Sequence, residues 1–150
     1  MAVYTHGHHD TVLRSHSNRT IENSAAYLAP YLAPEQTLLD VGAGPGTITL
    51  EFAARVGRVT AVEIDEAALS LSRTRVAEAG ATNIDFAVAD VHALPFDDGA
   101  FDVVHAHQVL QHVGDPVQAL REMRRVTKPG GVVAARDADY AGFIWFPLIP

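Results

Sequence analysis

Short β-branched runs alternate with longer runs of helical character along this 150-residue sequence. The pattern predicts five strands, at residues 37–41, 58–64, 84–89, 101–106 and 132–136. It predicts helices at residues 21–32, 47–56, 66–79 and 116–126, the first of them broken near Pro30. Strands that alternate with helices in this way are typical of a parallel sheet covered by helices.

Right-handed crossovers between such strands predict a doubly wound, Rossmann-like α/β fold. We expect a mainly parallel sheet with the strand order 3-2-1-4-5 and helices on both faces. The chain then divides into a helical segment at 1–36, a core at 37–137 and an apolar tail at 138–150. The tail, which contains GFIWFPLI, either packs back onto the core or begins a further region, and the fifth strand is left as an open edge.

The composition excludes several classes of function. The formal net charge is -7 and Lys128 is the one lysine, which argues against a nucleic-acid-binding surface. Without cysteine there is no disulfide, no thiolate metal site and no cysteine nucleophile. The N-terminus lacks the apolar core of a signal peptide, and no apolar run is long enough to span a bilayer. We therefore expect a soluble cytoplasmic domain.

The stretch LLDVGAGPGTITLEFA, at residues 38–53, places three glycines between a predicted strand and a predicted helix. A phosphate-binding loop of the Walker type needs a lysine after its last glycine, and none is present. A dinucleotide-binding loop has the pattern G-x-G-x-x-G, whereas this loop has G-x-G-x-G and Thr47 follows it. The loop thus predicts close approach of a ligand to the backbone, with only a weak indication of NAD.

Three carboxylates lie at or near the carboxyl ends of neighbouring strands of the predicted sheet, where doubly wound folds bind ligands. Asp40 precedes the loop and suits a ligand with an ammonium group. Glu63 lies at the separation from the loop at which a carboxylate binds ribose hydroxyls, while Asp65 is left to cap the next helix. Asp90 suits the amino group of an adenine. A ligand with a ribose, an adenine-like base and a positive charge is expected, and S-adenosylmethionine fits.

Four stretches in this order carry a resemblance to a known family: LLDVGAGPGTIT, VTAVEID, FAVADVHALPFDDGAFDVV and VTKPGGVV. The sequence resembles the class I S-adenosylmethionine-dependent methyltransferases, among them the proteins similar to ubiquinone and menaquinone biosynthesis methyltransferases. The resemblance covers roughly residues 20–137. It implies a seven-stranded sheet, whose last two strands would need more residues than follow Asp137.

The resemblance also implies a role for individual residues. The methionine moiety of the cofactor would be lined by Asp40, Gly42, Ala43 and Gly44. Glu63 would hold the ribose, and His107 would lie near the sulfonium. The segment NRTIENSAAYLAPYL resembles the lid helix of these enzymes, in which Arg19 would pair with the cofactor carboxylate and Tyr4 would close over it.

At the adenine, the resemblance places Ile64 against the ring, the Asp90 carboxylate on the amino group and the Val91 N–H on a ring nitrogen. No catalytic residue is assigned. For a hydroxyl acceptor His107 or His112 could serve as the general base, and a carbon or amine acceptor needs none.

The histidines are not expected to bind a metal. His6, His8 and His9 lie together near the terminus, without a second ligand cluster at a recognised spacing. His105 and His107 alternate along the fourth strand and should point to the same face, with His105 as a satisfied core histidine.

Four functions remain open from the sequence. The first is methyl transfer from S-adenosylmethionine to a small-molecule acceptor. The second is a cofactor-binding, non-catalytic subunit, stable as a homo-oligomer or with a partner that covers the fifth strand and the tail. The third is a fragment without activity of its own. The fourth, an NAD-dependent oxidoreductase, is disfavoured by the G-x-G-x-G loop and by Asp40.

Overall fold

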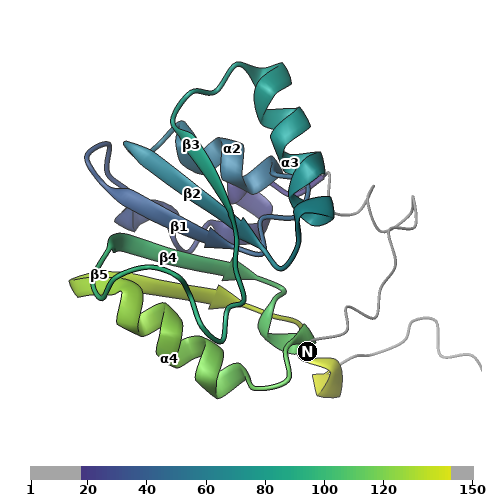
Figure 1. Cartoon of the computed structure of the whole chain (residues 1–150), viewed down its shortest axis with the longest axis vertical. Coiled ribbons are helices and arrows are strands. Elements are labelled where there is room, and N and C mark those ends of the chain that lie inside the picture. The colour runs from purple at the N-terminus through teal and green to yellow at the C-terminus, as the bar shows by residue number, and fades with distance from the viewer. Residues whose placement is uncertain (1–17, 143–150) are drawn as a thin grey trace, which may run out of the picture.

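The computed structural model of the chain describes residues 18–142. These residues form a five-stranded sheet with every pair of neighbours parallel and the order β3-β2-β1-β4-β5 (Figure 1). The strands are β1 (Thr37–Val41), β2 (Arg58–Glu63), β3 (Ile84–Val88), β4 (Phe101–His107) and β5 (Thr127–Arg136). The predicted strand order is confirmed. Tyr4, His6, His8, His9 and the tail from Phe143 to Pro150 lie outside the described residues.

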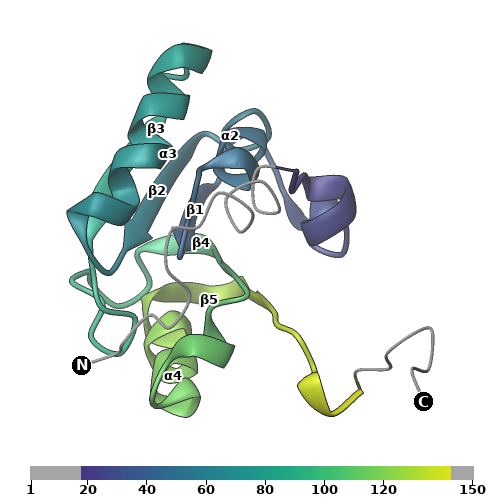
Figure 2. The same ribbon diagram turned by 90° about the vertical axis from the view of Figure 1, so that its right-hand side faces the viewer.

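Successive side chains of β1 point to opposite faces of the sheet, so each face packs against a different helix. Leu38 packs with Phe52 of α2 (Thr47–Ala53). Leu39 packs on the opposite face with Met123 of α4 (Pro116–Val126). Figure 2 shows α4 on one side of the sheet and α2 with α3 (Glu66–Ala79) on the other. The expected helices on both faces are therefore present.

Most element bounds agree with the sequence prediction to within three residues, and two elements differ more. The predicted helix at 21–32 is instead a π-helical turn, η1 (Ile21–Ala25), followed by a 3₁₀ turn, η2 (Ala29–Tyr31). Pro30 lies in that 3₁₀ turn and, because it has no N–H, cannot continue an α-helix from the preceding turn. The last strand begins at Thr127 rather than at residue 132, because Thr127 already pairs with Phe101, and a register shift follows before Val132 pairs with Val103.

The turn after β2 separates two neighbouring carboxylates into different roles. Asp65 is the N-cap of α3, and its side chain accepts a hydrogen bond from the Ala68 N–H at 2.8 Å. Glu63 is the last residue of β2, and its carboxylate accepts a hydrogen bond from the Gly44 N–H instead of capping the helix. The assignment of Asp65 as a helix cap is confirmed.

Replacing Asp65 with alanine is expected to lower the free energy of unfolding by about 1 kcal/mol, the usual cost of a lost N-cap. Chemical denaturation measures this, and the Asp65→Ser protein, which keeps a capping oxygen, should retain most of the stability. Equal stability of the alanine and wild-type proteins would contradict the capping role.

Within residues 18–142, the helices are all too short or too polar to traverse a bilayer.

Candidate functional site

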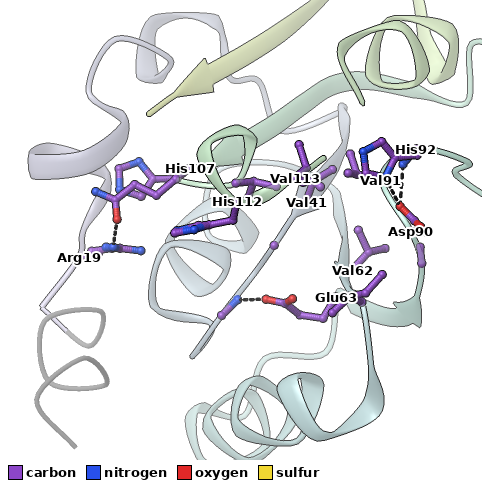
Figure 3. Close-up of a pocket in the computed structure, with 16 residues that line it drawn as sticks. Arg19, Val41, Val62, Glu63, Asp90, Val91, His92, His107, His112 and Val113 are labelled. Carbon is purple, nitrogen blue, oxygen red and sulfur yellow. Dashed lines mark hydrogen bonds and ion pairs between the residues drawn. The ribbon is translucent and has the colours of Figure 1, made fainter. Parts of the chain in front are cut away.

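A cleft opens at the carboxyl ends of the strands, with about 830 Å³ of empty space including its open mouth. Figure 3 shows residues from the N-terminal segment and from the ends of β1, β2, β3 and β4 around it. Most of the residues expected to bind a cofactor line this cleft: Arg19, Gly42, Gly44, Glu63, Ile64, Asp90, Val91 and His107. The other two, Asp40 and Ala43, line a smaller pocket that shares Arg19, Gly42, Gly44 and His107 with the cleft.

The glycine loop is held to β2 by backbone hydrogen bonds. The N–H of Gly42 donates to the Val62 carbonyl at 2.9 Å, and the N–H of Ala43 donates to the same oxygen at 3.3 Å. A Cβ on Gly42 would lie 2.5 Å from Cγ2 of Val109, so a side chain there would collide with the wall of the cleft. Gly44, by contrast, has a φ of +55° and open space where a Cβ would project. The loop therefore presents bare backbone to the cleft.

Glu63 connects the loop to the end of β2. Its Oε1 accepts a hydrogen bond from the Gly44 N–H at 2.7 Å, and Figure 3 shows this bond at the edge of the cleft. Burial raises the pKa of the Glu63 carboxyl, and the backbone N–H groups of Gly44 and Ile64 partly offset this by hydrogen bonding. A half-buried carboxylate at this position can accept further hydrogen bonds from ligand hydroxyl groups.

Asp90 and Val91 follow β3 on the far side of the cleft. Asp90 Oδ1 accepts a hydrogen bond from the His92 backbone N–H at 2.9 Å and lies 2.7 Å from His92 Nδ1. These bonds to His92, the backbone one above all, lower the pKa of the Asp90 carboxyl. The side chain is therefore an ionised acceptor at the cleft wall, beside the largely buried Val91. His92 was not predicted as a site residue, although an acidic residue two positions before it is a frequent turn pattern.

Asp40 is buried, with 3% of its surface exposed, and its two oxygens have separate partners. Oδ2 accepts from the Thr49 hydroxyl of α2 at 2.6 Å, and Oδ1 lies 2.9 Å from His105 Nδ1 of β4. Asp40 therefore joins three elements beneath the glycine loop. It lines the smaller pocket rather than the main cleft.

His105 and His107 point to the same face of β4, as expected, with their rings parallel within 7° and their centroids 6.4 Å apart. His105 is only partly the satisfied core histidine that the sequence suggested. Its Nδ1 faces Asp40, but its Nε2 has no hydrogen-bond partner among residues 18–142. Desolvation and the nearby Arg19 lower the pKa of His107 to about 4, so its ring is neutral at neutral pH.

Arg19 reaches the cleft from the N-terminal segment and donates a hydrogen bond to Gln108 Oε1. Gln108 has a φ of 56°, a left-handed conformation that is unusual for a residue other than glycine. Its N–H donates to the Arg136 carbonyl of β5 at 2.7 Å. Strained residues of this kind cluster at functional sites. No sequence pattern indicated Gln108, nor the apolar walls Val109 and Val113.

The sequence matches a known protein family over most of its length. Residues 39–135 match the family described as a methyltransferase domain. The chain belongs to the methyltransferase-domain family. The match begins in β1 and ends in β5, and so contains the glycine loop, Glu63, Asp90 and His107.

Named relatives of this methyltransferase-domain chain include an uncharacterised methyltransferase of Schizosaccharomyces pombe, 38% identical over 96% of this chain and 55% of that protein. The ubiquinone/menaquinone biosynthesis C-methyltransferase UbiE of Idiomarina loihiensis is 40% identical over 64% of this chain and 40% of that protein. The chain thus spans about half the length of these relatives. Among solved structures, YcgJ of Bacillus subtilis is 27% identical, with a TM-score of 0.74 over 77% of this chain and 50% of that one.

S-adenosylmethionine is the cofactor of this domain, as in the 30% identical structure from Methanosarcina mazei that is named an S-adenosylmethionine-dependent methyltransferase. The residues present fit it. The bare backbone at Gly44 leaves room for a ligand, Glu63 offers a carboxylate for ribose hydroxyls, and the exposed Ile64 offers an apolar surface for an adenine ring. Among the described residues, no cluster of three or more histidine and acidic side chains is arranged to hold a metal ion.

Proposed function

We propose that this chain binds S-adenosylmethionine in the main cleft and supports transfer of its methyl group to a small-molecule acceptor. The observation that carries the proposal is the position of Glu63, at the end of β2, hydrogen-bonded to the bare backbone of Gly44 at the edge of the cleft. A carboxylate there suits the two ribose hydroxyls, while the loop leaves room for the rest of the ligand. UbiE and its relatives, which share this region, are named C-methyltransferases.

In this proposal, different residues of the cleft contact different parts of the cofactor. Glu63 holds the ribose, Asp90 and Val91 hold the adenine, and Ile64 packs against it. Gly42, Ala43, Gly44, Asp40 and Arg19 surround the amino-acid end. The bound cofactor would supply an electrophilic methyl group, so the protein needs only to orient the acceptor and exclude water.

The choice of a general base now favours His112 over His107. With a pKa of about 4, His107 is too weak a base to take a proton from a hydroxyl group near pH 7. His112 also lines the cleft, and its Nε2 accepts a hydrogen bond from Gln111 Nε2 at 3.0 Å, so it must exchange this bond for the acceptor's hydroxyl before it can take a proton. For a hydroxyl acceptor we therefore propose His112 as the base, whereas a carbon or amine acceptor would not require one.

A partner-dependent subunit is the second candidate. The chain spans about half of its relatives, and β5 is an outer strand of the described sheet. One similar structure, at 25% identity and a TM-score of 0.70, is a complex between a methyltransferase and its activator from Haloferax volcanii. This candidate predicts cofactor binding without turnover by the chain alone.

A cytoplasmic location is in keeping with the acidic, cysteine-free sequence.

Calorimetric titration of the purified chain with S-adenosylhomocysteine, the product form of the cofactor, tests the proposal. Saturable binding is expected, and NAD at the same concentrations should give no heat, because the loop lacks the third glycine of the dinucleotide pattern. Preference for NAD, or no binding by a folded chain, would contradict the cofactor assignment. A subsequent assay for methyl transfer separates the enzyme from the non-catalytic subunit.

A further inference from the structure

The smaller pocket beneath the glycine loop is lined by two histidines with unsatisfied ring nitrogens. His105 is 1% exposed and His107 is 8% exposed. His105 Nε2 and His107 Nδ1 are both buried, and neither has a hydrogen-bond partner among the described residues. Both rings line the pocket, together with Asp40, Gly44 and Arg19. Buried polar atoms are nearly always hydrogen-bonded, so these two nitrogens indicate a group that completes the pocket.

The contacts of His105 determine what its free nitrogen can do. Nδ1 lies 2.9 Å from Asp40 Oδ1, and a carboxylate can only accept, so Nδ1 carries the proton. In a neutral imidazole the other nitrogen is then an acceptor. Phe52 contacts the ring edge-on at a centroid distance of 4.8 Å and helps to hold its orientation. In the neutral ring, Nε2 is therefore a hydrogen-bond acceptor whose orientation is held by Asp40 and Phe52.

The partner that this acceptor requires is a hydrogen-bond donor. An ammonium group has three N–H donors and no acceptor, and so satisfies Nε2 without leaving a lone pair unmatched. Arg19 lines the same pocket and supplies the positive charge that a neighbouring carboxylate needs. A pocket with an acceptor and a guanidinium side by side is complementary to an α-amino acid group.

We infer that His105 binds the α-ammonium group of the cofactor's amino-acid end through Nε2. This inference rests on the proposed binding of S-adenosylmethionine and assigns a residue that the sequence placed in the core. Asp40 acts through His105 as a positioning residue, since it fixes the proton on Nδ1. Thr49 in turn donates to Asp40 at 2.6 Å and holds the carboxylate in place.

Two ligands separate this role from a structural one. S-adenosylhomocysteine contains the amino-acid end, whereas 5′-methylthioadenosine has the same adenosine and a thioether but no ammonium group. Replacing His105 with asparagine keeps an N–H close to the position of Nδ1 and removes the acceptor at Nε2. Calorimetry should show S-adenosylhomocysteine binding weakened about tenfold or more, the effect of one hydrogen bond to a charged group, and unchanged binding of 5′-methylthioadenosine.

The matched variant is His105→Gln, whose amide lies near the position of Nε2 and can still accept a hydrogen bond there. It should retain more S-adenosylhomocysteine affinity than His105→Asn, although it loses the contact with Asp40. Equal effects of either variant on both ligands, or no effect of His105→Asn on S-adenosylhomocysteine, would overturn the inference. If the folded wild-type chain binds neither ligand, the proposed function fails and the inference with it. If only 5′-methylthioadenosine binds, the cleft proposal survives and the ammonium site is overturned.

Discussion

Replacing Glu63 with alanine is expected to weaken binding of S-adenosylhomocysteine by about 1–3 kcal/mol, the range for loss of a charged hydrogen-bond partner. The ribose hydroxyls would lose their hydrogen bonds with the carboxylate, and the Gly44 N–H would lose the acceptor that lies 2.7 Å away. Binding of 5′-methylthioadenosine should fall equally, because that ligand has the same ribose. Calorimetric titration of both ligands measures the two losses.

The nearby Asp65 provides the matched control for Glu63. Both carboxylates belong to the same turn, but Asp65 caps α3, so the Asp65→Ala protein should bind the ligand as tightly as wild type. Unchanged affinity of the Glu63→Ala protein, with a normal unfolding transition, would rule out the ribose assignment.

The affinity should also depend on pH through Glu63. Its pKa is raised above the ordinary value of 4.5 by burial, with smaller contributions from the charges of Asp40 and Asp65. Ribose hydroxyls bind the ionised form, so a protonated Glu63 must lose its proton before it binds. Affinity is therefore full well above the raised pKa and falls as the pH is lowered through it. The Glu63→Gln protein should bind more weakly throughout and lack this component of the pH dependence.

Local signals in the sequence predicted the parts of the site that depend on neighbours along the chain. The alternation of strands and helices predicted the sheet order, and the capping preference of Asp65 separated it from Glu63. The glycine loop was found because its spacing is itself the signal. Each of these features is set within a few residues, where sequence patterns and backbone geometry are directly linked.

The parts that sequence reasoning missed depend on contacts between distant residues. The Arg19–Gln108 hydrogen bond spans 89 positions, and the contact between Asp40 and His105 spans 65. Nothing in the local pattern of β4 reveals that one nitrogen of His105 is satisfied and the other is not. The left-handed backbone of Gln108 is likewise invisible, because glutamine has no preference for that conformation.

The Gly44→Val protein is expected to fold with reduced stability and to show no measurable binding of S-adenosylhomocysteine. A valine at a φ of +55° is strained by about 1–2 kcal/mol, and its side chain would project into space that no protein atom occupies within 4 Å. In the proposed complex that space belongs to the ligand, so the methyl groups would exclude it. Thermal unfolding and calorimetric titration measure the two effects separately.

Gly80 allows strain to be separated from exclusion of the ligand. It ends α3 with a φ of +67° and likewise has no atom within 4 Å of the position that a Cβ would occupy, but it does not line the cleft. The Gly80→Val protein should therefore lose a similar amount of stability and keep its full affinity. If both valine variants lose binding in parallel with their stability, the effect at Gly44 is a general consequence of strain. If the Gly44→Val protein binds normally, the ligand does not approach the loop backbone, and the assignment of the cleft as the cofactor site is wrong.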